Sequence, residues 1–333
     1  MSVLPSPNSY RPYDPVYRDG IIGKFNAPGN YIFDAALPAV SIGDEAIKSG
    51  QILKTADGTL RNMRGTNALL WNSGSDVPQH PGVDLTTAVT YVQKRYGDSV
   101  PEDLDSIVTE GDLIPGGKVA LNHMAMVEGL KIRRELDFLN LCVAANTGQD
   151  TNLTAGSGWN EAGGDPIGNI KDAAEYVSRT GFDADTMVIG RAAWWALMNN
   201  DALVERMSTG GSRHGMSYNA FAALMQDLFG IDRVLIAKVR YTAENAKGTP
   251  TIGDALGDTC IVYKRVEQGV QVEGQAGDVA VTPGWIARVQ GFDLRLDNFR
   301  DDRKHQLVHR ASFAEALAVM DTGYAAGIYN CVV

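Results

Sequence analysis

The chain has 333 residues, of which 44% are hydrophobic and 21% charged, and its 30 basic and 40 acidic residues give a formal net charge of −10. This hydrophobic content excludes a chain that is disordered throughout, and the length favours two packed units over one core. The acidic balance argues against a dedicated high-affinity DNA-binding protein, because it repels polyphosphate over most of the surface.

The three cysteines, Cys142, Cys260 and Cys331, lie far apart and form no CxxC motif. This pattern is typical of a reducing compartment and argues against a disulfide framework or a cysteine-based zinc site. No apolar stretch follows basic residues near the N-terminus, so we expect no signal peptide. No run of 18 apolar residues occurs, so we expect no membrane-spanning segment.

The first half of the chain has two segments that are poor in apolar residues. Residues 1–45 hold six of the 13 prolines, which predicts an extended arm that lies on a neighbour, with a disordered tail as the alternative. In residues 46–97, Asp57-Gly58 indicates a hairpin turn and residues 86–96 a strand. So polar a hairpin needs a partner surface to be stable.

The next segment predicts one long helix. Pro101 and the acids after it mark the start of a short helix in residues 101–113. Residues 118–145 contain no proline and repeat apolar side chains such as Met124 and Leu130 at helical spacing, which predicts an amphipathic helix about 40 Å long. Four charged residues interrupt the apolar stripe midway: Lys131, Arg133, Arg134 and Glu135.

Residues 165–295 alternate helical and strand patterns, which predicts a separate α/β unit. Asp165 is placed to cap a helix whose first residue is Pro166. Further helices are expected at 191–199 and 219–229, and short buried strands at 186–189, 234–237 and 259–265. Near the C-terminus, residues 309–319 fit either a strand or a helix, and residues 324–329 fit a strand.

The sequence holds few groups that could carry catalysis. In residues 111–119 the lysine is one place late for a phosphate loop and Val119 replaces the serine or threonine, and neither GxGxxG nor GxSxG occurs. His305 and His309 would share one face of a helix, as a metal pair requires, but a surface or packed role is the favoured interpretation. The neighbouring acids alternate with arginines, which is typical of a self-paired surface: Asp297, Asp301 and Asp302.

Trp194-Trp195 is interpreted as core filling rather than as a stacking platform. We therefore expect no enzymatic activity, no cofactor and no metal. The arm and the hairpin instead expose backbone N–H and C=O groups that cannot all find hydrogen-bond partners within one molecule. This predicts obligate assembly.

The order of several short motifs resembles the major capsid proteins of tailed bacteriophages with the Hong Kong 97-type fold. Trp159-Asn160 is followed by the capped helix at Asp165-Pro166 and by the run Thr186-Met187-Val188-Ile189-Gly190. Leu228-Phe229-Gly230-Ile231, Val234-Leu235-Ile236, Tyr241-Thr242-Ala243 and the closing Ala326-Gly327-Ile328 continue the likeness. The resemblance covers most of the chain and is strongest in the middle.

The resemblance implies an α+β, Hong Kong 97-like capsid fold with an N-terminal arm, an extended loop, a peripheral domain with a long spine helix, and an axial domain. These parts correspond to residues 1–45 for the arm, 46–97 for the extended loop, 98–164 and 296–333 for the peripheral domain with spine helix 118–145, and 165–295 for the axial domain.

The resemblance also implies a function: self-assembly into hexamers and pentamers that form the icosahedral head shell around double-stranded DNA, without sequence-specific binding. The implied location is the virion, after synthesis in the host bacterial cytoplasm, and the further implied partners are scaffolding, portal and decoration proteins. Six residues are candidates for inter-subunit contacts: Arg61, Arg64 and Trp71 on the loop, and Arg133, Arg134 and Glu135 on the spine helix.

Two alternatives stay open. An encapsulin-like bacterial compartment would have the same fold around a protein cargo, although the long proline-rich arm favours a phage protein. A metal-dependent enzyme would use His305, His309 and the nearby acids.

Overall fold

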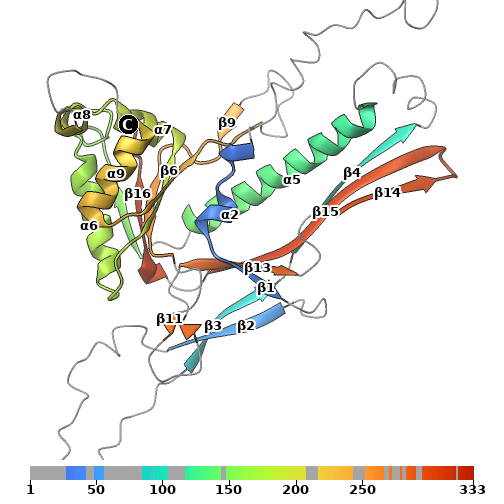
Figure 1. Ribbon diagram of the computed structural model, residues 1–333, viewed down its shortest axis with the longest axis horizontal. Coiled ribbons are helices and arrows are strands. Elements are labelled where there is room, and N and C mark those ends of the chain that lie inside the picture. The colour runs from blue at the N-terminus through green and yellow to red at the C-terminus, as the bar shows by residue number, and fades with distance from the viewer. Residues whose placement is uncertain are drawn as a thin grey trace, which may run out of the picture.

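The computed structural model describes residues 28–42, 49–55, 85–92, 94–103, 117–143, 148–207, 217–242, 252–265, 270–271, 278–279, 283–289, 295–319 and 322–333. Within these ranges the chain has an α+β arrangement with two five-stranded sheets (Figure 1). One sheet belongs to an α/β unit at one end of the molecule, and the other runs beside one long helix.

Short apolar runs form the central strands of the α/β unit. β6 (Thr186–Gly190) and β10 (Cys260–Tyr263) are buried along their whole length, as is typical of strands covered on both faces. β6 pairs in parallel with β7 (Arg233–Ala237) and antiparallel with β10. β16 (Ala325–Tyr329) runs antiparallel to β10, and β5 (Gln149–Asn152) runs parallel to β16. The four strands that the sequence predicts here are present, and β5 is an addition.

The helices of this unit begin and end where local signals place them. The Asp165 carboxylate accepts a hydrogen bond from the Gly168 N–H at 2.9 Å, and Pro166 is the first residue of α6 (Pro166–Ser178). Ser217 caps α9 (Tyr218–Phe229), and Gly230 ends it in the left-handed conformation at φ 70°. Two short helices lie between them: α7 (Arg191–Met198) and α8 (Asp201–Met207), the second of which the sequence did not predict.

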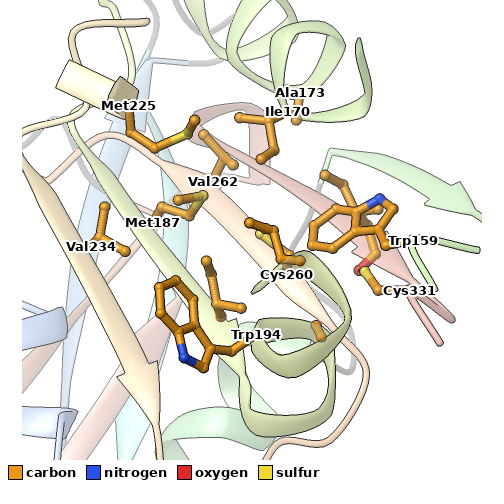
Figure 2. Packing of buried hydrophobic residues seen from close by; sticks show 14 of the residues in the cluster. Trp159, Ile170, Ala173, Met187, Trp194, Met225, Val234, Cys260, Val262 and Cys331 are labelled. Carbon is orange, nitrogen blue, oxygen red and sulfur yellow. The ribbon is translucent and has the colours of Figure 1, made fainter. Parts of the chain in front are cut away.

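The core of the unit packs between these helices and the sheet (Figure 2). Trp159 is fully buried there, and its ring N–H donates to the Asn169 side chain at 3.0 Å. Trp194 stacks edge-to-face on Phe221, with 5.4 Å between ring centroids. The predicted core role is therefore confirmed for Trp194 and wrong for Trp195, which is 55% exposed on the other side of the same helix.

The second sheet is built around one long strand. β15 (Gln306–Val319) pairs with β14 (Arg295–Asp301) over its first half and with β13 (Gly284–Val289) over its second half. β4 (Lys94–Asp103) pairs with its first ten residues, and β1 (Ala39–Ile42) runs parallel to β13. The ambiguous stretch 309–319 is therefore a strand, because pairing along both of its edges stabilises the extended form.

The predicted helix start at Pro101 is wrong, because residues 101–103 continue β4. Pro101 lies opposite Val308 of β15. A proline lacks an N–H for the ladder and is tolerated at the edge of a sheet, and β4 is an edge strand. Long-range pairing with β15 outweighs the local helix-start signal.

The predicted long helix is confirmed as α5 (Gly117–Val143), which lies along β15 and β4 (Figure 1). Met126 and Leu130 pack with Ala311 and Phe313 of β15. Met124, which belongs to the apolar stripe that the sequence predicted, is 49% exposed. The position of β15 decides which side of this weakly amphipathic helix is buried.

One part of the predicted extended arm is instead helical and buried. α2 (Phe33–Ala36) is a single turn, and Ile32, Phe33, Ala36 and Leu37 join a core made by α5 and both sheets. Residues 1–27 and 43–48 lie outside the described part of the chain.

β2 (Ser49–Thr55) pairs antiparallel with β3 (Leu85–Val92), whereas the predicted turn at Asp57-Gly58 lies outside the described residues. Two small pairs complete the fold: β8 (Arg240–Thr242) with β9 (Ile252–Asp254), and β11 (Val270–Gln271) with β12 (Asp278–Val279). The predicted division into domains stays a prediction, although β5 and β16, which it assigns to the peripheral domain, pair within the sheet of the α/β unit.

Asn200 provides a test of the core of the α/β unit. Its buried amide donates to the Trp159 carbonyl at 3.1 Å and accepts from the Leu203 N–H at 3.2 Å. We expect Asn200→Ala to lower the free energy of unfolding by about 2 kcal/mol, because it removes two buried hydrogen bonds and leaves the Trp159 carbonyl without this donor. Urea denaturation measures this loss. Asn199→Ala, at the exposed neighbouring position, is the control and should change it by less than about 0.5 kcal/mol.

Candidate functional site at the long helix

α2, α5 and β15 meet at a cluster of charged and aromatic side chains that we call the junction: Ile32, Phe33, Arg134, Glu135, Phe313 and Glu315. Its members come from three regions that are about 100 and 180 residues apart in the sequence. Two of the four charged residues that interrupt the apolar stripe of the long helix, Arg134 and Glu135, lie here.

Arg134 connects α5 to β15. Its guanidinium donates from Nε and from a terminal nitrogen to the Glu315 carboxylate, at 3.0 and 2.7 Å. Both side chains are largely buried, with exposed fractions of 13% and 6%. The guanidinium also lies over the rings of Phe33, at 4.0 Å, and Phe313, at 5.0 Å. The bidentate pair and the two aromatic rings offset part of the cost of burying this charge.

Glu135 connects the same turn of α5 to the N-terminal segment. Its fully buried carboxylate accepts hydrogen bonds from the backbone N–H groups of Ile32 and Phe33, both at 3.1 Å. Burial raises the pKa of Glu135 from its ordinary 4.5 to about 7, because it outweighs the two N–H donors, and the nearby Asp34 adds to the rise.

The other end of α2 is held by the α/β unit. The hydroxyl of Tyr263, on β10, donates to the Ala36 carbonyl at 2.6 Å. Phe138 and Leu139 of α5, Val188 of β6 and Ile286 of β13 pack around the same turn. This one helical turn therefore contacts the long helix and both sheets, and couples the two halves of the subunit mechanically.

The structure describes three of the six predicted contact residues. Arg61, Arg64 and Trp71 lie outside the described residues. Arg133 has a 59% exposed side chain and pairs with Asp137 at 3.2 Å. Arg134 and Glu135 point into their own subunit instead, because β15 and α2 cover that side of the helix. Whether any of the six contacts another subunit stays a prediction.

Sequence reasoning missed the partners Phe33 and Glu315. Nothing in the local pattern of Phe33 distinguishes it from other residues of a proline-rich segment. Glu315 is an acid within the otherwise apolar run 313–319, and a buried acid in such a run requires a partner of opposite charge. That observation could have indicated a buried ion pair, but not which arginine forms it.

The residues of the alternative metal site do not converge. His305 lies in the turn before β15 with φ 50°, so it does not share a helix face with the buried His309 on that strand. Asp297 pairs with Arg310 at 3.2 Å, and Asp302 pairs with Arg300. Within the described residues, no group of three or more His, Cys, Asp or Glu side chains is arranged to hold a metal ion.

Cys260 and Cys331 are buried as free thiols. Burial raises the pKa of each thiol well above its ordinary value, which disfavours the nucleophilic thiolate. Among the described helices, none combines the length and the hydropathy needed to cross a membrane.

Comparisons with known proteins find phage capsid proteins. Residues 145–276 match a family model described as phage major capsid protein E. The "Major capsid protein" of Burkholderia phage BcepMu is 24% identical over 316 residues, which cover 93% of this chain and 94% of that protein.

Solved structures share the fold over almost the whole chain. A phage-related protein from Bordetella bronchiseptica RB50 matches with a TM-score of 0.62 at 14% identity, over 96% of this chain and 98% of its own. The capsid of Myoviridae phage XM1 matches with a TM-score of 0.55 at 13% identity, over 99% of both chains. The chain therefore has the Hong Kong 97-type fold of phage capsid subunits, and both the family model and the full-length relative that it matches are phage major capsid proteins.

Proposed function

We propose that this chain assembles with copies of itself into hexamers and pentamers, which close as the icosahedral head shell of a phage around double-stranded DNA. The observation that carries the proposal is the match to the Burkholderia phage major capsid protein over nearly the full length of both chains, on a fold shared with phage capsids. A repeated subunit closes a shell through many modest contacts, which symmetry multiplies.

The sheet beside α5 supports a subunit that is completed by its neighbours. β14 is an edge strand whose Leu296 and Phe299 side chains are 49% and 48% exposed. An edge strand that exposes both main chain and large apolar side chains invites pairing with another chain. In a shell, a neighbouring copy would cover this edge and remove it from water.

The charge balance fits a container rather than a DNA-binding protein. A net charge of −10 limits attraction to phosphates, so enclosed DNA would be held without sequence-specific contacts. The proposal places the protein in the virion after synthesis in the host cytoplasm. It assigns the chain no enzymatic activity, and adds scaffolding, portal and decoration proteins as further partners.

An encapsulin-like compartment is the second candidate, because encapsulin shells share this fold. The fold alone does not separate the two functions. The Burkholderia phage relative and the capsid family model favour the phage shell. The metal-dependent enzyme is not favoured, because Asp297 and Asp302 are paired with arginines and the two histidines lie on different elements.

Electron microscopy of the full-length chain tests the proposed assembly. Expressed alone or with the other head proteins of its phage, the chain should form closed shells with fivefold and sixfold capsomers. Particles from phage-producing cells should hold DNA that resists DNase. Uniform small monomers under all conditions would contradict shell formation, and shells filled with a protein cargo and no DNA would favour the encapsulin alternative.

Arg133 is exposed and its neighbour Arg134 is largely buried. Substitutions at the two positions therefore test a role in assembly and a role in folding separately. Arg133→Glu should reduce the yield of shells while lowering the free energy of unfolding by at most about 1 kcal/mol, because the side chain is exposed and its i,i+4 pair with Asp137 becomes a like-charge pair. Arg134→Ala should lower that free energy by about 3 kcal/mol, since it leaves the buried Glu315 carboxylate without its partner.

Denaturation of unassembled subunits and particle yield on a sizing column give the two readouts. Arg179→Glu, at a 68% exposed position on α6, serves as the control for charge reversal at a distant surface. Normal shells from Arg133→Glu would remove Arg133 from the contact candidates. An unfolding free energy that Arg134→Ala leaves unchanged would contradict the structural role of the ion pair.

A further inference from the structure

The junction contains a buried acid that the capsid architecture does not by itself explain. Glu135 is the acceptor for the backbone N–H groups of Ile32 and Phe33, and it is closed off from water. A carboxyl group in such a place is either ionised, at the cost of losing its hydration, or protonated and neutral. Its protonation therefore affects how firmly residues 31–37 are held.

We propose that Glu135 is a pH-sensitive latch, which holds residues 31–37 against the long helix and the two sheets when it is protonated and weakens their docking when it is ionised. The segment is held at one end by Glu135 and at the other by the Tyr263 hydroxyl on the Ala36 carbonyl. Between these ends it contributes four buried apolar side chains to the core. Loosening the Glu135 end would free the chain that precedes Tyr31 from this anchor.

The surroundings support a switch centred on Glu135. The Arg134 guanidinium is occupied by Glu315 through two short hydrogen bonds, so it is not available as a full counter-ion for Glu135. Asp34 adds negative charge that disfavours ionisation. The charged and titratable groups around the latch, from the N-terminal segment, α5, β15 and β10, are Tyr31, Asp34, Lys131, Arg134, Glu315 and Tyr263.

The direction of the effect follows from linkage. In the docked state the pKa of Glu135 is about 7, whereas a carboxyl freed into water returns to about 4.5, so docking binds the proton more tightly. Docking is strongest below pH 4.5 and weakens as the pH rises through 7. The full change corresponds to a weakening on the order of a hundredfold.

Hydrogen–deuterium exchange of the full chain tests the latch directly. After correction for intrinsic exchange rates, protection of the Ile32 and Phe33 amides should fall on the order of 10- to 100-fold between about pH 5 and about pH 8.5. Amides of β6, in the buried sheet, report global stability and should not follow the same profile. The readout does not require shells to form, so a failure to assemble would leave the result interpretable.

The variant Glu135→Gln mimics the protonated acid and keeps an acceptor oxygen for the two N–H groups. It should keep the segment protected at both pH values and abolish the pH dependence. Glu175→Gln, at a 60% exposed position on α6, is the matched control and should retain the wild-type profile. Wild-type protection that is equal at both pH values would overturn the proposal, as would a Glu135→Gln profile that follows the wild type. If Glu135→Gln does not fold, the wild-type profile alone decides.

Discussion

Two adjacent residues of α5 connect the parts of this subunit. Successive residues of a helix point about 100° apart, so Arg134 faces β15 while Glu135 faces the N-terminal segment. The guanidinium is held by Glu315 and by two aromatic rings, and the carboxylate is held by two backbone N–H groups. Because both groups are buried, losing either partner would leave a polar group unsatisfied in the core.

This arrangement joins parts of the subunit that do not share a single large core. Among the described residues, the α/β unit has its own core around Trp159 and Met187, and the sheet beside α5 packs on that helix through a smaller cluster around Met126 and Phe313. The turn formed by α2 packs between them and belongs to a core that both sheets share. A subunit of this kind keeps a defined shape while its long edges stay available to other copies, which suits a shell built by repetition.

The candidate site was partly predictable from the sequence. A cluster of charges in the apolar stripe of a long helix indicates that this turn contacts polar groups as well as apolar ones. Two members of the cluster at 131–135, Arg134 and Glu135, lie in the junction. The interpretation as an outward contact fits the exposed Arg133, but Arg134 and Glu135 face inward. Their partners lie about 100 and 180 residues away, and no local pattern encodes pairing over that separation.

The sequence by itself determined the elements whose signals are local. Helical spacing and the absence of proline predicted α5, the Asp165 cap and Pro166 set the start of α6, and runs of β-branched residues marked β6 and β7. Only the tertiary structure decided that Pro101 lies in a strand, that residues 309–319 are extended, and that a turn of the proline-rich segment is buried. The reason is that β15 and α5 supply hydrogen-bond partners and apolar surface from distant parts of the chain, and these outweigh weak local preferences.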